Sequence, residues 1–267
     1  MPYGYTGKTL QVDLTNRKID VEENDETFYR NYLGGRGVGY RYLLKQVPAG
    51  IDPLGPENIL VLATGVMTGS PLAASCRFAA VGKSPLTGAA GESEAAGLFG
   101  PELKQAGFDT VVFQGKSEKP VYLWVNDGKA ELKDATELAT LSTRALEDAI
   151  RDELGSAKIR VAQTGLAGMK GVLYANITNN LSNFNGRNGM GALMGSKNVR
   201  AVAALGSQKL AFADPDYLRQ TAKEFAKTFR NNPAGEALYV YGTTAFPEIL
   251  SAGGALLVNN FRRSSLA

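Results

Sequence analysis

The 267-residue sequence contains no histidine and a single cysteine, Cys76. Without an imidazole, the chain cannot build a Ser-His nucleophile pair, a histidine-ligated zinc site or a histidine general base. A single thiol excludes an intrachain disulfide. It also excludes an iron–sulfur cluster ligated by this chain alone, because such a cluster usually takes about four thiolates. Any chemistry must therefore come from carboxylates, lysine, tyrosine or a bound cofactor.

The sequence also lacks long apolar runs and a strong charge imbalance. No stretch approaches the roughly 18 apolar residues that a membrane span needs, and residues 1–8 contain no apolar signal-peptide core. The 29 Lys and Arg residues are scattered among 26 Asp and Glu residues, which leaves a formal charge of +3. We therefore expect a soluble, cytoplasmic protein with neither a nucleic-acid partner nor a membrane partner.

The apolar content, at 44% of the residues, is sufficient for a large globular core. Short runs rich in Val, Ile, Leu and aromatic residues predict strands. The expected strands are residues 9–14, 18–22, 59–64, 77–82, 110–114, 121–125, 130–133, 159–163, 172–177 and 199–205. Asn126-Asp127-Gly128 favours a hairpin turn between two of them, because Asp-Gly tolerates positive φ angles.

Helices are expected at residues 25–33, 38–46, 101–105 and 142–154, where Ser142 is a suitable N-cap for the last. The pattern changes at Asp214-Pro215, which favours the start of a helix that runs to about Arg230. We expect an α+β domain over residues 1–208. Residues 209–267 are expected to begin a mostly helical domain that continues beyond this chain.

The 31 glycines exceed the usual share of roughly 7% and gather in four segments, at residues 34–39, 64–71, 95–100 and 186–198. Glycine lets backbone N–H groups approach an anionic or planar ligand closely, so a large phosphorylated cofactor would suit these segments. Tight turns are the alternative explanation for any one of them. The last segment is not a dinucleotide-binding motif, because no strand precedes it, and no Walker motif precedes Lys83-Ser84.

Several motifs, in order, resemble the aldehyde:ferredoxin oxidoreductase family. They are Gly4-Tyr5-Thr6-Gly7-Lys8, Val12-Asp13-Leu14-Thr15, Tyr32-Leu33-Gly34-Gly35-Arg36-Gly37, Asp52-Pro53-Leu54-Gly55-Pro56-Glu57-Asn58, Lys83-Ser84-Pro85-Leu86-Thr87-Gly88, Phe99-Gly100-Pro101-Glu102-Leu103-Lys104 and Gly191-Ala192-Leu193-Met194-Gly195-Ser196-Lys197-Asn198. Each motif alone is modest, but the ordered set, from residue 4 to about 206, is specific.

The resemblance implies two β-sheets related by a pseudo-twofold axis, which form a base for a tungsten or molybdenum bis-pyranopterin cofactor. It implies oxidation of aldehydes to carboxylic acids, with ferredoxin or an electron-transfer subunit as the partner, and it is compatible with a homo-oligomer. Magnesium would bridge the pterin phosphates. The [4Fe-4S] cluster is expected in the missing C-terminal part, so we expect this chain alone to be inactive and to contribute no catalytic side chain.

The resemblance also assigns the cofactor-binding residues. Arg77 matches an arginine beneath the pterin, and Gly186 and Arg187 match a second pterin-contacting turn. The stretch Glu94, Ala95, Ala96 and Gly97 matches an Asn-Ser-Gly-Gly stretch that touches the pterin. Two departures are Glu94 in place of asparagine and Asn183-Phe184-Asn185 in place of Arg-Ala-Ala. The backbone carbonyls of Glu94 and Phe184 would hold magnesium, since main-chain oxygens do not depend on side-chain identity.

Other residues have simpler explanations. Cys76 is expected to be a small buried apolar residue, and Trp124 a core or interface residue. Glu92 and Glu94 are expected in a Gly/Ser-rich loop, where carboxylates are more often solvated than catalytic. Lys83, Lys104 and Lys197 are candidates for the phosphate side of the site, with surface lysines as the commoner alternative.

Two other functions remain open at this stage. A truncated or cofactor-free paralogue that acts as a binding or assembly module is favoured by the altered turn at Asn183-Phe184-Asn185 and by the missing cluster cysteines. An unrelated nucleotide-binding enzyme would need a strand–loop–helix phosphate site, which the sequence does not contain.

Overall fold

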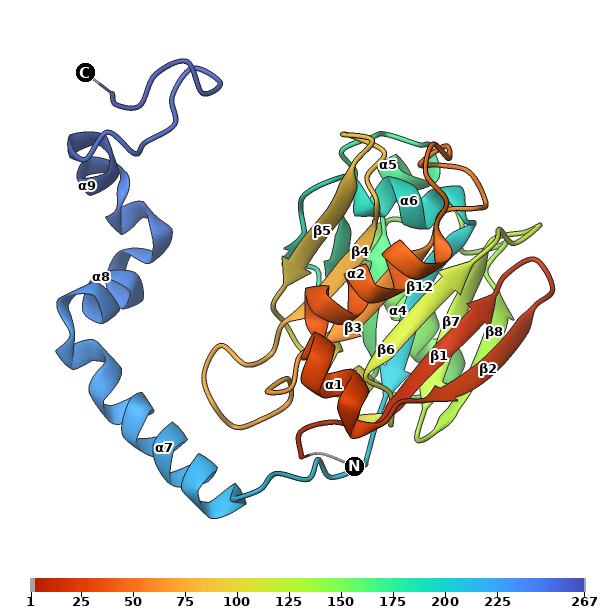
Figure 1. The fold of residues 1–267 in the computed structure, drawn as a ribbon, viewed down its shortest axis with the longest axis horizontal. Coiled ribbons are helices and arrows are strands. Elements are labelled where there is room, and N and C mark those ends of the chain that lie inside the picture. The colour runs from red at the N-terminus through yellow and green to blue at the C-terminus, as the bar shows by residue number, and fades with distance from the viewer. Residues whose placement is uncertain (1–2, 267) are drawn as a thin grey trace. The chain divides into compact units, whose positions relative to one another are not determined.

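The structure is a computed structural model that describes residues 3–266 (Figure 1). Its strands are β1 (Lys8–Asp13), β2 (Lys18–Glu23), β3 (Leu60–Thr64), β4 (Phe78–Lys83), β5 (Ala90–Ala95), β6 (Thr110–Gln114), β7 (Val121–Asn126), β8 (Lys129–Asp134), β9 (Arg160–Thr164), β10 (Ile177–Asn179), β11 (Asn183–Asn185) and β12 (Val199–Leu205). Its α-helices are α1 (Glu26–Tyr32), α2 (Gly35–Gln46), α3 (Phe99–Gln105), α4 (Thr143–Leu154), α5 (Leu166–Met169), α6 (Met190–Ser196), α7 (Pro215–Thr228), α8 (Pro233–Tyr241) and α9 (Pro247–Ala252).

The strands of the described chain form two six-stranded sheets with the same connectivity. The strand order is β2-β1-β6-β3-β4-β5 in the first sheet and β8-β7-β12-β9-β10-β11 in the second. The pairs β1–β6 and β7–β12 are parallel, and every other neighbouring pair is antiparallel in both sheets. This repeat confirms the expected α+β fold with two related sheets.

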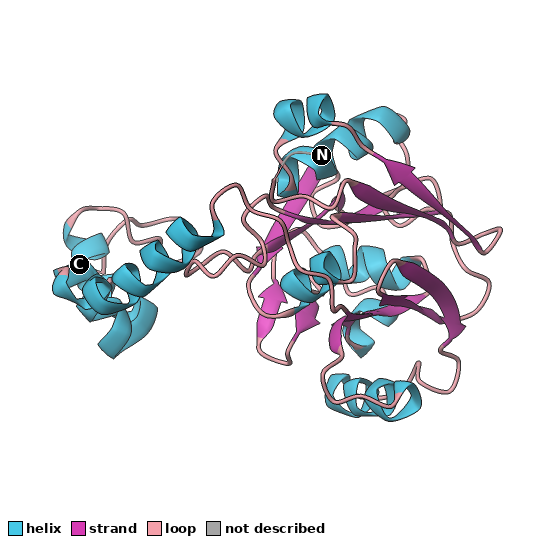
Figure 2. Cartoon of the chain, turned by 90° about the horizontal axis from the view of Figure 1, so that it is seen from below, coloured by secondary structure: helices cyan, strands magenta, loops and turns pink. Residues whose placement is uncertain are grey.

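The two sheets are separate layers with helices between them and on their outer sides (Figure 2). The largest core lies between the sheets, where Phe99 and Leu103 of α3 and Leu193 and Met194 of α6 are fully buried. A second core packs α2 on the first sheet, and a third packs α4 on the second sheet. Burial of these apolar surfaces is the main stabilising contribution to such a fold.

The sequence signals for one helix cap and one hairpin turn predicted the structure correctly. Ser142 accepts a hydrogen bond from the Ala145 N–H and caps α4, as its sequence position predicted. Asp127 and Gly128 both have positive φ, at 41° and 85°, in the turn between β7 and β8. Trp124 of β7 is partly buried and packs against the third core, which favours the core alternative of the expectation.

Several expected elements were wrong or missing. The expected strand at residues 172–177 is mostly a turn, in which Leu173 and Tyr174 are exposed. The segment 90–95, expected as a loop, forms strand β5, and Asn183–Asn185 forms β11. Helices α5 and α6 were also not predicted. Arg77, expected within a strand, directly precedes β4.

Part of the last glycine-rich segment serves the packing of α6 against α5 and against the segment that precedes β10. A Cβ atom on Gly191 would lie 2.1 Å from the Asn176 carbonyl oxygen, and one on Gly195 would lie 2.2 Å from the Gly168 carbonyl oxygen. Both distances are far below van der Waals contact, so only glycine fits these positions. The need for close backbone approach therefore comes from the fold at these two residues.

Lys104 and Lys197 are fully buried, contrary to the expectation of surface or phosphate-lining lysines. Lys197 Nζ donates to the carbonyls of Asn58 and Gly115, the latter at 2.9 Å. Lys104 Nζ donates to the Gly65 carbonyl at 2.6 Å and lies 3.9 Å from Asp109. Both ammonium groups therefore satisfy buried backbone acceptors in the loops around the first sheet.

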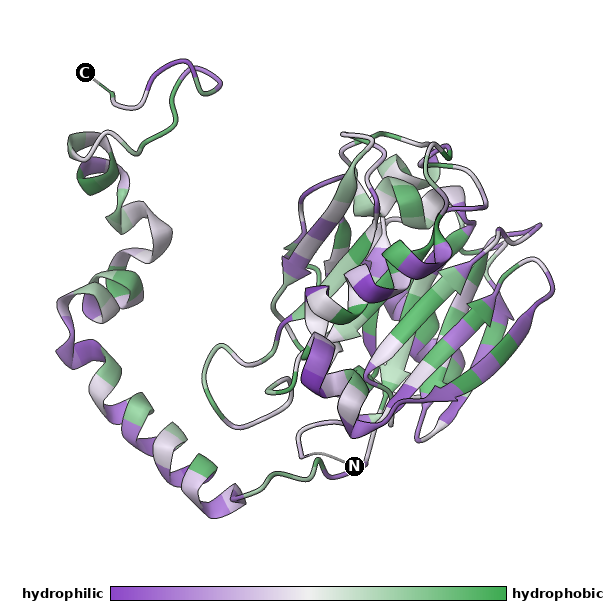
Figure 3. Cartoon of the chain, in the orientation of Figure 1, coloured by the Kyte–Doolittle hydropathy of each residue, from purple (hydrophilic) through white to green (hydrophobic). Residues whose placement is uncertain are grey.

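The chain divides into two compact units. The first unit ends at Pro215, and the second begins at Asp216. The second unit contains α8, α9 and most of α7. Among its described residues, none of those in these three helices is buried. Apolar and polar residues alternate along α7 (Figure 3), as expected for a helix with one apolar face. Within residues 3–266, no helix is long and apolar enough to cross a membrane.

Candidate functional site

The edge strands β5 and β11, one from each sheet, meet through side-chain hydrogen bonds. Asn185 Nδ2 donates to the Ser93 carbonyl at 2.7 Å, and Asn188 Nδ2 donates to the Glu92 carbonyl at 2.7 Å. The Arg187 N–H donates to Ser93 Oγ at 3.1 Å. Edge strands have backbone groups free for such contacts, so the two sheets are joined along this line.

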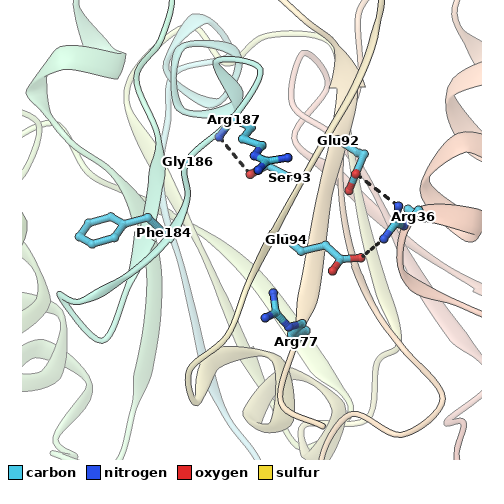
Figure 4. Close-up of a pocket in the computed structure, with 8 residues that line it drawn as sticks. All are labelled: Arg36, Arg77, Glu92, Ser93, Glu94, Phe184, Gly186 and Arg187. Atoms are coloured by element: carbon cyan, nitrogen blue, oxygen red, sulfur yellow. Dashed lines mark hydrogen bonds and ion pairs between the residues drawn. The ribbon is translucent and has the colours of Figure 1, made fainter. Parts of the chain in front are cut away.

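A pocket of about 480 Å³ opens beside this junction (Figure 4). Its lining combines cationic, anionic and aromatic side chains with a glycine. The lining residues are Arg36, Arg77, Glu92, Ser93, Glu94, Phe184, Gly186 and Arg187. They come from the first turn of α2, the residue before β4, strand β5 and the segment that begins with β11, so residues from both sheets contribute.

Two of the three arginines have no side-chain partner in the part of the chain that the structure describes. The side chains of Arg77 and Arg187 are exposed and make no hydrogen bond or ion pair there. Each guanidinium group retains its planar set of donors for a ligand. Arginines with this freedom are suited to bind carboxylate or phosphate groups through paired hydrogen bonds.

The third arginine, Arg36, lies between two carboxylates. Its Nη1 is 3.6 Å from Glu92 Oε1, and its Nη2 is 3.2 Å from Glu94 Oε1. Glu92 and Glu94 point to the same side of β5 because residues two apart in a strand share a face. Burial raises the pKa of Tyr40, and the negative charge of Glu92 raises it further.

Phe184 lies at the opposite side of the pocket from Arg36, and its ring points away from the other labelled side chains (Figure 4). Its side chain is 49% exposed, although it is a large aromatic residue on a short strand. An exposed aromatic residue at one side of a pocket with charged donors at the other suits a ligand that combines a planar ring with anionic groups.

The structure brings together five of the cofactor-binding residues expected from the sequence. Arg77, Glu94, Phe184, Gly186 and Arg187 all line this pocket. A second pocket of about 270 Å³ adjoins it and shares Arg77 and Glu94. The cofactor role of these residues remains a prediction.

The other expected residues lie outside the lining of the larger pocket. Ala95, Ala96 and Gly97 end β5 and enter a turn, where the Ala96 carbonyl accepts a hydrogen bond from Asn179 Nδ2 at 3.0 Å. Asn183 is half-buried, and its carbonyl lies within hydrogen-bond reach of the same Asn179 amide, at 3.4 Å. Of these four residues, Ala96 joins the two sheets through its contact with Asn179.

Arg36 was not among the expected site residues. Its sequence signal was the glycine-rich segment 34–39, which contains a single arginine, but the sequence does not reveal which acidic residues lie near it. Lys83, also a candidate, lies away from this pocket, and its Nζ donates to the Ile51 carbonyl at 2.6 Å.

Cys76 is half-buried and unpaired, not fully buried as expected. Among the described residues, no group of three or more His, Cys, Asp or Glu side chains is placed to hold a metal ion.

Comparison with known proteins gives a consistent result. Residues 9–206 match the model of the aldehyde ferredoxin oxidoreductase N-terminal domain. The tungsten-containing aldehyde ferredoxin oxidoreductase of Pyrococcus furiosus is 40% identical over 261 residues, which cover 97% of this chain and 43% of that protein. The corresponding protein of Thermococcus kodakarensis is 39% identical, with the same coverage of both chains.

Two relatives have other names. A WOR-like subunit of an aliphatic sulfonate oxidoreductase from Pyrococcus furiosus is 34% identical and is matched over 90% of this chain and 42% of that protein. A solved structure of the active-site complex BamBC of benzoyl coenzyme A reductase, bound to 1,5-dienoyl-CoA, has a TM-score of 0.84 and 34% identity. It is matched over 88% of this chain and 36% of that chain. The chain thus spans less than half the length of these relatives.

Proposed function

Because this chain belongs to the aldehyde ferredoxin oxidoreductase family and carries its N-terminal domain, we propose that it is the cofactor-binding part of an enzyme that oxidises aldehydes to carboxylic acids. Ferredoxin, or a dedicated electron-transfer subunit, is the proposed electron acceptor. The proposed cofactor is a bis-pyranopterin with tungsten, the metal named in the tungsten-containing relatives.

One observation carries the proposal. Arg77 and Arg187, whose side chains make no hydrogen bond or ion pair within residues 3–266, line one pocket from the two sheets. Uncompensated guanidinium groups at a shared opening fit a ligand with anionic groups, such as the phosphates of two pterins. The exposed ring of Phe184 offers a surface for a planar heterocycle.

The chain's residues would bind and orient the cofactor, which when bound supplies the oxygen-transfer and two-electron chemistry. Arg77 and Arg187 would each hold an oxygen-bearing group by charge-assisted hydrogen bonds. The backbone carbonyls of Glu94 and Phe184 are the proposed ligands of a magnesium ion between the phosphates. Both residues line the pocket and belong to the edge strands β5 and β11, which supports this part of the proposal.

The remaining functions are proposed for the part of the protein beyond this domain. These are the [4Fe-4S] cluster and the residues that select the substrate. The relatives are named for aldehydes, for aliphatic sulfonates and for benzoyl coenzyme A. Proteins that share this domain thus differ in substrate, which supports a general role for the domain in holding the cofactor.

The test uses the complete enzyme that carries Arg77→Ala or Arg187→Ala, with Arg144→Ala on the exposed face of α4 as a matched control. Each pocket variant should lose about 1.5–3 kcal/mol of cofactor binding, or one to two powers of ten in affinity. Metal and pterin content per protein and the melting temperature are the measurements. Loss of cofactor with an unchanged fold supports the proposal.

Unchanged cofactor content in both variants would contradict the assignment of the pocket. If the unmodified enzyme retained no metal or pterin, a cofactor-free binding module, favoured by the altered turn at Asn183–Asn185, would be the better function. Arg77→Lys should rescue only partly, since lysine lacks the planar pair of donors.

A further inference from the structure

We propose that Arg36 is a positioning residue that neutralises Glu92 and Glu94, so that the pocket accepts a phosphate-bearing ligand. The inference rests on the proposed function of this pocket and adds a residue to it. Arg36 acts through the two carboxylates, whereas Arg77 and Arg187 are proposed to contact the ligand.

The geometry places Arg36 in contact with both acids. Its guanidinium group lies 3.6 Å from a Glu92 oxygen and 3.2 Å from a Glu94 oxygen, and Figure 4 shows all three side chains converging at one side of the pocket. Glu92 and Glu94 are about a quarter to a third exposed, at 27% and 30%. Their charges are therefore less screened by water than those of fully exposed carboxylates.

The charge balance explains why this contact matters. Besides Arg36, the charged residues of the lining are the cations Arg77 and Arg187 and the anions Glu92 and Glu94. With Arg36 present, the cations exceed the anions. Without it, the cations no longer exceed the anions, and Glu92 and Glu94 lose the cation that contacts them, so a phosphate that enters the pocket meets two carboxylates without a paired cation. Like charges at such distances repel, which lowers anion affinity.

The backbone around Arg36 is held by contacts that do not involve the Arg36 side chain. Gly34 N donates to the Tyr32 carbonyl at 2.7 Å, and Gly37 N donates to the Gly34 carbonyl at 3.1 Å. Gly34 also forms a bridge with Gly65. The Arg36 side chain is 60% exposed. Its removal should therefore leave the fold intact and change mainly the charge of the pocket.

The experiment measures binding of inorganic pyrophosphate to the 267-residue chain by isothermal titration calorimetry, in magnesium-free buffer at low salt. The variants are Arg36→Ala, Glu94→Gln and the double variant Arg36→Ala/Glu94→Gln. The control is Arg30→Ala, because Arg30 is an exposed arginine of α1 that pairs with Glu26 outside the pocket. Melting temperatures check that each variant is folded.

We expect Arg36→Ala to weaken pyrophosphate binding about tenfold, as for the loss of a close charge interaction. Glu94→Gln should strengthen binding severalfold. The double variant should return to within about threefold of the unmodified chain, because removal of the acid makes its neutralisation unnecessary. Both effects should shrink at high salt.

Two results would overturn the inference while the proposed function stands. The first is normal pyrophosphate affinity in Arg36→Ala. The second is a loss in Arg36→Ala that Glu94→Gln does not rescue, which would make Arg36 a direct ligand-binding residue. Absence of pyrophosphate binding by the unmodified chain would instead overturn the proposed function of the pocket, and this inference with it.

Discussion

The Asn185 side-chain amide donates a 2.7 Å hydrogen bond to the backbone carbonyl of Ser93, although the two residues are 92 positions apart. Asn185 is fully buried at the end of β11, and Ser93 lies in the middle of β5. The bond therefore crosses from one sheet to the other. Because Ser93 also lines the pocket, the relative position of the two halves of the candidate site depends on this contact.

Asn185→Ala should destabilise the first unit by about 1–3 kcal/mol, because the buried Ser93 carbonyl loses its donor. Urea unfolding followed by the fluorescence of Trp124, the single tryptophan of the sequence, measures this change. Ser182→Ala, at an exposed position of the turn that precedes β11, is the control and should change the stability by less than about 0.5 kcal/mol. Equal stability of the two variants would show that the contact does not hold the sheets together.

The strands that build the site were the hardest to predict from the sequence. β3 and β6 are buried on both faces and consist of continuous apolar runs, so their composition was sufficient. β5, with the sequence Ala-Gly-Glu-Ser-Glu-Ala, and β11, with Asn-Phe-Asn, are edge strands whose polar side chains face a pocket or a neighbouring edge. Their strand conformation depends on pairing with β4 and β10, which composition does not reveal.

The candidate site itself could be predicted only in part. The residues Arg77, Gly186 and Arg187 were found through resemblance to a family. The contact of Arg36 with Glu92 and Glu94 joins segments more than fifty residues apart, and local sequence has no signal for such a pair. The buried lysines were missed for a similar reason, because their carbonyl acceptors are distant in the sequence.

Lys197→Met should destabilise the first unit by about 2–3 kcal/mol. Lys197 Nζ donates to the carbonyls of Asn58 and Gly115, and methionine fills a similar volume without a donor. Hydrogen bonds from charged groups are stronger than neutral ones, and the buried acceptors would remain unpaired. Thermal and urea unfolding measure the loss, with Lys170→Met on an exposed turn as the control. A stability close to that of the control would show that Lys197 contributes no net stabilisation.

The stability of the first unit should increase from pH 7.5 to pH 9.5. Burial lowers the pKa of Lys104 and of Lys197 to about 8, and the nearby carboxylates of Asp109 and Glu57 oppose the effect. In the unfolded chain these lysines titrate near their ordinary value of 10.5. Between the two values the unfolded state binds more protons, so the free energy of unfolding rises with pH and is lowest below pH 8.

The expected gain is about 1–3 kcal/mol for the two lysines together. Above about pH 10 the trend should reverse, because burial raises the pKa of Tyr29 and of Tyr42, the latter to about 12, so the unfolded tyrosines ionise first. Urea unfolding at a series of pH values measures the curve. Lys104→Met/Lys197→Met should flatten the rise, and an equally steep rise in this variant would assign the effect to other groups.

Phe184→Ala should weaken the binding of a planar heterocycle and leave the binding of pyrophosphate unchanged. Phe184 is 49% exposed and lies on the opposite side of the pocket from Arg36 and its two glutamate partners. An offset-stacked aromatic pair contributes about 0.5–1.5 kcal/mol, so the expected loss is roughly twofold to tenfold in affinity. Free pterin, followed by its fluorescence, is the probe for the ring, and Phe184→Tyr should still bind pterin.

Tyr174→Ala is the control, because Tyr174 is an exposed aromatic residue that does not line this pocket. A loss of pterin binding confined to Phe184→Ala would place the heterocycle against β11 and the phosphates against the arginines. Equal pterin affinity in Phe184→Ala and Tyr174→Ala would instead show that the exposed ring does not contact the ligand.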